Sequence, residues 1–232
     1  MVKSYVIRKG HYTDAQKKAY DSLSSKYLIP VPRDSLTSEY TVNAGKLDLK
    51  KTFFNISNVI MEIGFGSGTT TAEIAKVNPD NNYICIEVHR PGIGRLLWEI
   101  EKRNLSNIRI IEYDAVFVAE KMIPNNSLNA IHIFFPDPWP KKRHRKRRLV
   151  QRPFTEILAN CLKPEGYIYM VTDWEDYADH ALEELTMTSS LKNQYNGFAL
   201  PQKWRPKTRF EQKGLEKNHV IRELLFIKNN IV

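Results

Sequence analysis

The sequence predicts an α/β protein in which a mostly parallel sheet carries helices on both faces. Short segments dense in Ile, Val, Phe and Tyr alternate with longer segments whose apolar residues recur at helical spacing. This alternation is typical of parallel strands joined by helical crossovers. Two further observations agree with it. A glycine-rich loop follows the first strand of the series, and an acidic residue stands near the end of each of five strands.

The strands and helices are expected in a regular order from residue 57 onward. Strands are expected at 58–63, 82–88, 107–113, 129–135 and 166–172, and helices at 70–77, 91–103, 115–122, 149–162 and 174–187. Residues 220–227 form a final strand-like stretch that would pair antiparallel at the sheet edge. The sheet would therefore be parallel except at its end.

The N-terminal part of the chain precedes this alternation. Thr13 and Gln16 have the spacing of a capping box, which predicts a short helix that ends near Tyr27. No linker is long enough to separate two domains. We therefore expect a single domain over residues 1–232, with residues 1–45 as a short N-terminal appendage.

Composition excludes several classes of protein. The 232 residues carry a formal charge of +9, and 42% of them are hydrophobic, which excludes a largely disordered chain. No apolar run approaches the ~18 residues of a membrane-spanning helix, and no signal peptide is expected. Cys85 and Cys161 lie in apolar segments without a partner at metal-ligand spacing, so we expect buried thiols. We therefore expect a cytoplasmic protein that binds neither a metal nor a membrane.

The excess positive charge is concentrated in one run. Residues 141–148, Lys-Lys-Arg-His-Arg-Lys-Arg-Arg, hold seven cations and directly follow the rigid segment from Phe134 to Pro140. A basic octamer alone is as typical of a solvated surface or a nuclear-import signal as of a binding site. Beside an aromatic and acidic segment with the features of a site, it favours a polyanionic substrate, of which nucleic acid is the obvious one. Lys203 to Arg222 is a second basic stretch, expected to form the other wall.

An acidic residue stands at or near the end of each expected strand: Glu62, Glu87, Asp114, Asp137 and Asp173. Ligands of open α/β sheets bind outside the carboxyl ends of the strands, where parallel strands would gather all five acids along one rim. Loop acids are common, and Asp173 is also a fair helix cap, but five acids in register favour a binding site. Such a rim suits a ligand that carries cations and hydrogen-bond donors.

The loop after the first strand indicates the kind of ligand. Its three glycines are Gly64, Gly66 and Gly68. Glycines let a backbone turn sharply and approach a cofactor closely. A nicotinamide-binding loop would have its third glycine where this chain has Thr69. The spacing here is G-x-G-x-G with Glu62 two residues ahead, which is the form used for S-adenosylmethionine. Glu87, at the end of the second strand, would accept hydrogen bonds from the two ribose hydroxyls.

The segment after the fourth strand indicates the chemistry. Asp137-Pro138-Trp139 at a strand end resembles the Asp-Pro-Pro-aromatic signature of nucleic-acid amino-methyltransferases. Prolines at 136, 138 and 140 fix the backbone φ, so Asp137 and Trp139 would be held in place. An aromatic ring there can stack on an extruded base. The alternative is a proline-rich turn with Trp139 in the core, although Pro-Asp-Pro is a poor strand exit.

Together these motifs resemble the bacterial tRNA (guanine-N7-)-methyltransferases, which modify guanosine 46 in the variable loop of tRNA. The resemblance covers about residues 5 to 228 and is most specific from His132 to Val150. The other matching stretches are Glu62 to Gly68, Ile86 to Gly94, Asn107 to Ala115, Thr172 to Tyr177 and Arg205 to Gly214. It implies a Rossmann-like class I methyltransferase fold with a mostly parallel seven-stranded sheet. It also implies S-adenosylmethionine as cofactor and tRNA as partner, with no obligatory protein partner for a monomer or homodimer.

The resemblance also implies roles for individual residues. Glu62, Glu87 and Asp114 would contact S-adenosylmethionine together with the glycine loop. Asp137 would be the active-site acid and a further cofactor contact. The implied substrate contacts are Lys141, Asp173, Thr208, Arg209, Phe210 and Glu211. The implied tRNA-binding residues are Arg143, His144, Arg145, Lys146, Arg147 and Arg148. We expect Asp173 or Glu211 to read the guanine edge that carries N1–H and the N2 amine.

Three other functions stay open on the residues alone. The Asp-Pro-Trp segment suggests an exocyclic-amine RNA or DNA methyltransferase, whose reaction must lose a proton and gives an uncharged product. A non-catalytic RNA-binding protein with a vestigial cofactor fold is disfavoured by the intact Glu62, Glu87 and glycines. Binding of S-adenosylmethionine would decide that case. An NAD-dependent oxidoreductase is disfavoured by Thr69.

Overall fold

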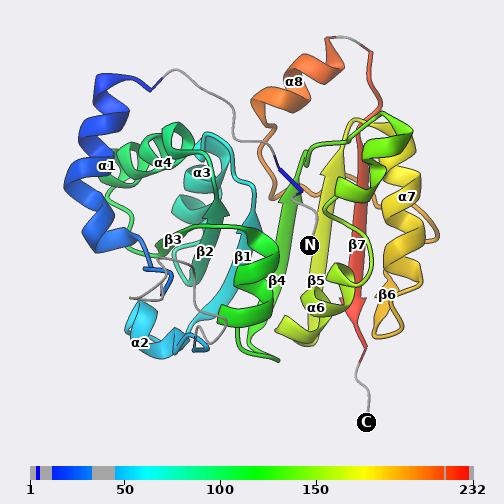
Figure 1. Ribbon diagram of the computed structural model, residues 1–232, viewed down its shortest axis with the longest axis horizontal. Coiled ribbons are helices and arrows are strands. Elements are labelled where there is room, and N and C mark those ends of the chain that lie inside the picture. Colours follow the sequence, from blue (N-terminus) through cyan, green and yellow to red (C-terminus); the bar gives the residue numbers. More distant parts are fainter. Residues whose placement is uncertain (1–3, 6–11, 33–44, 217, 230–232) are drawn as a thin grey trace.

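A seven-stranded sheet forms the centre of the computed structural model, which describes residues 4–5, 12–32, 45–216 and 218–229 (Figure 1). The strands are β1 (Asn58–Ile63), β2 (Asn81–Glu87), β3 (Ile108–Glu112), β4 (Leu128–Phe134), β5 (Leu162–Thr172), β6 (Leu191–Asn193) and β7 (Arg222–Lys228). Their order in the sheet is β3-β2-β1-β4-β5-β7-β6. β1 to β5 run parallel, and β7 pairs antiparallel with β5 and β6. The expected mostly parallel sheet is confirmed.

Helices connect these strands and lie on both faces of the sheet (Figure 1). They are α1 (Asp14–Tyr27), α2 (Leu49–Phe53), α3 (Thr69–Val77), α4 (Arg90–Arg103), α5 (Ala115–Phe117), α6 (Phe154–Cys161), α7 (Glu175–Thr186) and α8 (Arg209–Leu215). A turn of π-helix (Val118–Met122) continues α5, and a 3₁₀ helix spans Lys142–Arg147. Within the described ranges, no helix combines the length and apolar character that crossing a membrane requires.

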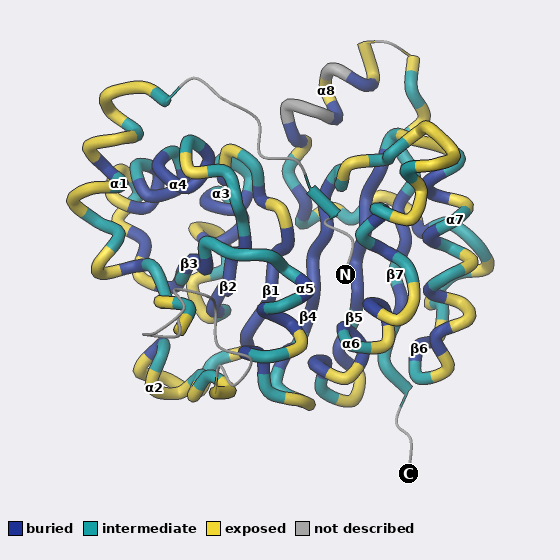
Figure 2. The backbone as a smooth tube through the Cα atoms, in the orientation of Figure 1, coloured by how far each residue is buried: buried dark blue, intermediate teal, exposed yellow. Residues whose placement is uncertain are grey.

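The sheet divides the apolar interior into two layers. One layer packs against α5, α6 and α7, and the other packs against α1, α3 and α4. Figure 2 shows the central strands buried and the exposed residues on the outer sides of the helices. On β1, Met61 and Ile63 belong to the first layer and Ile60 to the second. Because side chains alternate between the faces of a strand, Glu62 lies on the side of α3 and α4.

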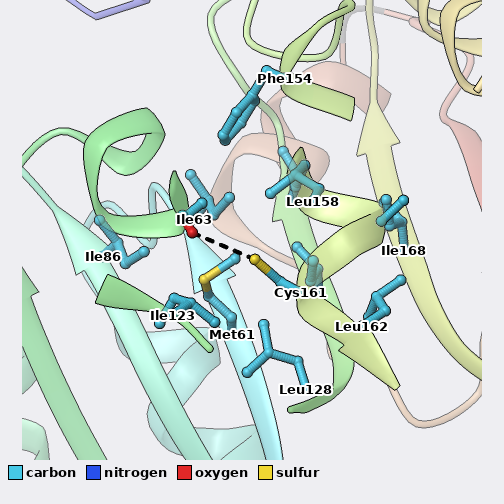
Figure 3. Packing of buried hydrophobic residues seen from close by; sticks show 14 of the residues in the cluster. Met61, Ile63, Ile86, Ile123, Leu128, Phe154, Leu158, Cys161, Leu162 and Ile168 are labelled. Carbon is cyan, nitrogen blue, oxygen red and sulfur yellow. Dashed lines mark hydrogen bonds between the residues drawn. The ribbon is translucent and has the colours of Figure 1, made fainter. Parts of the chain in front are cut away.

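Both cysteines are free and buried, as the sequence predicts. Figure 3 shows Cys161 among Met61, Leu158 and other apolar residues of the first layer. Its thiol donates to the carbonyl oxygen of Ala119 at 3.5 Å. Burial raises the pKa of the Cys161 thiol to about 11. These thiols are core residues rather than nucleophiles, because the reactive form of cysteine is the thiolate.

The N-terminal helix α1 is docked on the domain. It begins with the expected capping box, in which Thr13 and Gln16 bond each other's backbone N–H. Gly94 of α4 lies so close to α1 that a Cβ there would be 2.5 Å from the Gln16 carbonyl oxygen. After α1, the Ile29 N–H donates to the Ile110 carbonyl at 2.8 Å, beside edge strand β3. The appendage therefore extends both the helical layer and the sheet.

Four local features differ from the sequence prediction or lie beyond it. α6 begins at Phe154 instead of near residue 149, because the ring of Pro153 is excluded from a helix interior. The strand β6 and the helix α2 have only 3 and 5 residues, too few for periodicity to reveal. α8 begins with a capping box of Thr208 and Glu211, a signal that is present in the sequence.

The expected acidic rim is confirmed by the topology. Because β1 to β5 are parallel, their carboxyl ends meet at one edge of the sheet. Glu62 is the penultimate residue of β1 and Glu87 is the last of β2. Asp114, Asp137 and Asp173 follow β3, β4 and β5 in the loops at the same edge.

Candidate active site

The loop between β1 and α3 turns sharply at three glycines. Gly64, Gly66 and Gly68 have φ angles of 74°, 60° and 67°, a left-handed conformation that side chains rarely adopt. A Cβ on Gly64 or Gly66 would meet nothing within 4 Å, so open space lies beside this part of the loop. On its other side, a Cβ on Gly92 of α4 would lie 2.0 Å from the Gly66 carbonyl oxygen. The loop is thus packed against α4 and open toward the rim.

Glu87 holds this loop from the end of β2. Its Oε2 accepts a hydrogen bond from the Gly66 N–H at 2.9 Å. Its Oε1 accepts from the N–H groups of Val88 and His89 at 2.7 and 3.1 Å. Three backbone donors therefore fix the carboxylate beside the glycine loop. Each of its oxygens has two lone-pair sites, so the carboxylate can accept further bonds from a hydroxyl-bearing ligand.

Glu62 lies behind the loop and is 3% exposed. Burial raises the pKa of its carboxyl to about 7; the nearby Thr71 hydroxyl lowers it and the charge of Glu87 adds to the rise. A carboxyl with a pKa near neutrality changes charge in the physiological range, which is common at functional sites. In its ionised form it attracts a cationic group brought to the loop.

These residues fit S-adenosylmethionine. The ligand combines hydroxyl donors with positive charge, which suits the carboxylates of Glu62 and Glu87. The left-handed glycines leave room for its close approach to the backbone. Asp114, half-buried at the end of β3, uses its Oδ1 to cap α5 by accepting from the Phe117 N–H at 3.0 Å. It lies on the same rim as the two glutamates.

Asp137 is exposed in a loop whose backbone has an uncommon conformation. Phe135 and Trp139, on either side of it, have φ angles of 50° and 46°, which bulky residues rarely adopt. The Phe135 N–H donates to the Val171 carbonyl at 2.8 Å, which ties the loop to β5. The Trp139 indole N–H donates to the Ser4 carbonyl at 3.0 Å. The loop is therefore fixed at both ends and holds Asp137 at the rim.

The basic run of residues 141–148 divides into exposed and buried members. The exposed cations are Lys141, Lys142, Arg143, Arg145 and Lys146. His144 is half-buried and edge-on to the Trp139 ring, with 5.9 Å between centroids. The Arg147 guanidinium covers the same ring at 4.1 Å from its centroid. Trp139 thus stacks on Arg147, and Arg148, expected among the tRNA contacts, has a side chain only 1% exposed.

Asp173 lies between β5 and α7, beside α8. Its Oδ2 is 3.0 Å from Nδ1 of His219 and 3.2 Å from the place that a Cβ on Gly214 of α8 would occupy. An open cavity of about 450 Å³ is lined by Asp173, Trp174, Glu175, Asp176, Asp179 and His219. A tryptophan ring and carboxylates in this lining can offer a stacking face and acceptors to a planar base.

Thr208 and Glu211 are buried at the start of α8. The Glu211 N–H donates to the Thr208 hydroxyl at 3.0 Å, and the Thr208 N–H donates to Glu211 Oε2 at 3.4 Å. Arg205 donates from both terminal nitrogens to the Glu211 carboxylate, and its Nη2 also reaches Glu223 of β7 at 2.8 Å. The Tyr169 hydroxyl bonds Glu223 in turn. The Glu211 carboxylate is therefore engaged within the protein.

The structure brings the candidate residues together in two groups on one edge of the sheet. Those expected at the cofactor surround the ends of β1 to β3, and those expected at the substrate surround β4, β5 and α8. The side chains of Arg209 and Phe210 lie outside those described. Sequence reasoning did not single out Arg205 or Glu223, although an acid within the apolar strand β7 is a signal for a buried partner. Among the residues described, no cluster of His, Cys, Asp or Glu is arranged to hold a metal ion.

Comparison with known proteins identifies the family to which this chain belongs. A family described as "Putative methyltransferase" matches residues 57–224. A tRNA (guanine-N(7)-)-methyltransferase of Nitrosomonas europaea is 47% identical over 227 residues, covering 98% of this chain and 96% of the relative. The corresponding protein of Francisella tularensis subsp. novicida is 42% identical, with 98% and 95% covered. The chain belongs to the tRNA (guanine-N(7)-)-methyltransferase family.

Membership of the tRNA (guanine-N(7)-)-methyltransferase family confirms the resemblance seen in the motifs and, with it, S-adenosylmethionine as the methyl donor. Among solved structures, the 16S rRNA methyltransferase KamB has a TM-score of 0.59 at 13% identity and covers 79% of this chain and 94% of its own. The antibiotic-resistance methyltransferase Kmr gives 0.56 at 13% identity, with 86% and 99% covered. At this identity the likeness concerns the fold, and it confirms the Rossmann-like class I methyltransferase architecture.

Proposed function

We propose that this protein transfers a methyl group from S-adenosylmethionine to N7 of guanosine 46 in the variable loop of tRNA. The observation that carries the proposal is one sheet edge, where the glycine loop with Glu62 and Glu87 shares a rim with Asp137 and the exposed cations of residues 141–146. The near full-length match to tRNA (guanine-N(7)-)-methyltransferases supports the same reaction. We expect the protein to act in the cytoplasm without an obligatory protein partner.

Different residues of the rim would bind different parts of the methyl donor. S-adenosylmethionine supplies an electrophilic methyl group carried on a sulfonium. Glu87, fixed by three backbone N–H groups, would accept the ribose hydroxyls. Glu62 would oppose the positive charge, and the backbone at Gly64 and Gly66 would allow close approach. Asp114 would complete the site at the end of β3.

Methylation of guanine at N7 does not require a general base. N7 of guanine has an in-plane lone pair and carries no hydrogen, so no proton leaves as the new bond forms. Positive charge instead moves onto the purine ring. We assign Asp137 the roles of stabilising that charge and orienting the base. An exocyclic amine, by contrast, would need a group that accepts its proton.

Recognition of guanine is assigned to Asp173 in preference to Glu211. The guanine edge away from N7 offers the N1–H and the N2 amine, which one carboxylate can accept together. Glu211 already pairs with Arg205 and caps α8. Asp173 lines the open cavity next to Trp174, a residue that is 37% exposed and whose ring could stack on a base. Asp173 would therefore read the base.

The decisive test combines purified protein, S-adenosylmethionine and an unmodified tRNA transcript, followed by nuclease digestion and mass spectrometry of the nucleosides. Formation of cationic 7-methylguanosine, lost when the variable-loop guanosine is replaced, would support reaction, atom and substrate together. A methylated amine would keep the fold and cofactor but move the chemistry to the exocyclic-amine reaction. Donor binding with no transfer to any tRNA would overturn the proposed substrate.

Affinity for S-adenosylmethionine is expected to rise about tenfold from pH 6 to pH 8. Burial raises the pKa of Glu62 to about 7, and only its ionised form opposes the ligand's positive charge, so the apparent Kd falls in proportion as the ionised fraction grows. Calorimetric titration across this range measures the rise, with Glu62→Gln as the control that should lack it.

The folding stability of the protein should show the opposite dependence on pH. The stability that Glu62 contributes is fully present below pH 4.5, the ordinary pKa of its carboxyl. That stability is lost as the pH rises through about 7, the pKa in the folded protein.

Affinity for tRNA is expected to fall steeply with salt. If the five exposed cations of residues 141–146 each neutralise one phosphate, log K should fall with log salt at a slope of roughly −3.5 to −4.5. Filter binding at several salt concentrations measures the slope. Lys146→Met should reduce its magnitude by about 0.7 to 0.9, whereas Lys76→Met, an exposed site at the far end of α3, should leave it unchanged. A wild-type slope near −1 would contradict this footprint.

A further inference from the structure

Arg148 is the last cation of the basic run, and its environment differs from that of the exposed five. Its Nε donates to the Pro138 carbonyl at 3.0 Å, and its Nη1 donates to the Asp176 carbonyl at 3.3 Å. Its Nη2 pairs with the Asp176 carboxylate of α7. The guanidinium also packs on the Tyr177 ring, 5.0 Å from its centroid. All three nitrogens of Arg148 are thus bonded within the protein, in a side chain 1% exposed.

The partner of Arg148 in the active-site loop, Pro138, is the residue next to Asp137. This loop has two bulky residues in the left-handed region, Phe135 and Trp139. Such conformations cost roughly 1–3 kcal/mol each and persist only where the surroundings hold them. Besides the bonds to Val171 and Ser4, this loop is held by the end of the basic run, where Arg147 covers the Trp139 ring and Arg148 bonds the Pro138 carbonyl.

We propose that Arg148 is a positioning residue for the methyl transfer and not an RNA contact. By tying Pro138 to Asp176, it fixes the loop that carries Asp137 against the first turn of α7. The inference rests on the proposed function only for the role of Asp137 in the reaction. The basic run then has two parts: exposed cations that contact tRNA, and a terminal arginine that orders the active site.

The test separates kcat from tRNA binding. Arg148→Ala is expected to lower kcat roughly 10- to 100-fold, because a small displacement of a reacting group costs a rate factor of this size. The Kd for tRNA and its salt slope should stay within about twofold of wild type, and so should the Kd for S-adenosylmethionine. Lys146→Met, which removes an exposed cation of the same basic run, should instead raise the Kd for tRNA. Millimolar guanidinium chloride should restore part of the kcat of Arg148→Ala, and equimolar sodium chloride should not.

A second variant keeps the test decisive if Arg148→Ala fails to fold. Asp176 is 42% exposed, so Asp176→Asn is expected to fold while weakening the bond to Arg148. It also weakens the pair that Asp176 Oδ1 makes with Arg145 at 2.8 Å, which leaves that exposed cation available to RNA. Loss of an acid near the RNA-binding face should not weaken tRNA binding. A fall in kcat without a rise in the Kd for tRNA therefore supports positioning.

Two results would overturn the inference. One is unchanged kcat in Asp176→Asn together with unchanged kcat in any folded Arg148 variant. The other is a higher Kd for tRNA and a shallower salt slope in Arg148→Ala with kcat intact, which would return Arg148 to the RNA contacts. Failure of the proposed function looks different. The wild type would then form a product other than 7-methylguanosine, and the kcat for that product would still test Arg148.

Discussion

Asp137→Asn is expected to lower kcat for methyl transfer roughly 100-fold while the Kd for tRNA changes less than threefold. The substitution keeps the shape and the hydrogen-bonding oxygen but removes the negative charge that would stabilise the methylated purine in the transition state. Loss of one preorganised electrostatic group in an active site typically costs a rate factor of 10²–10³. Single-turnover assays with enzyme in excess over tRNA measure the transfer step directly.

The matched control for this variant is Asp80→Asn. Asp80 is exposed and precedes β2, so it lies at the edge of the sheet opposite the rim. Its replacement by asparagine removes the same negative charge. Its kcat should stay within twofold of wild type. If Asp137→Asn abolished tRNA binding while turnover of the bound complex stayed intact, the catalytic role of Asp137 would be lost. An equal effect in both variants would point to net charge alone.

The fold was predictable because its signals are repeated along the chain. Each parallel strand is dense in apolar residues, and in β1 five of six residues are buried. The acidic rim followed from that prediction, since parallel strands must end on the same edge. The short elements were not predictable, because three residues in β6 carry no periodicity.

The environments of individual charged residues were much harder to predict. Along the chain Arg148 is one cation among seven, and nothing in its neighbours indicates that it is buried. Its partner, Asp176, lies 28 residues away and meets it only after α7 packs on the sheet. Glu211 was likewise expected at the substrate, but its carboxylate pairs with Arg205. Sequence patterns identify residue types and spacing, whereas burial depends on tertiary packing.

Arg205→Met is expected to lower the free energy of unfolding by about 3–5 kcal/mol. Arg205 lies between two buried carboxylates, Glu211 of α8 and Glu223 of β7, with side chains only 7% and 2% exposed. Removing the cation leaves both acids buried without a counter-charge, which is far costlier than losing a surface pair. For a chain of this length the melting temperature should fall by roughly 10 °C. Thermal and urea denaturation measure both quantities.

Two further variants show whether unpaired charge is the cause. Arg152→Met breaks the Arg152–Glu184 pair, whose arginine is 39% exposed, and should cost far less stability than Arg205→Met, because water already screens an exposed pair. Adding Glu211→Gln and Glu223→Gln to Arg205→Met removes the unpaired carboxylates and should recover part of the loss. If the triple variant is no more stable than Arg205→Met, lost packing of the arginine side chain, and not unpaired charge, is the cause of the deficit.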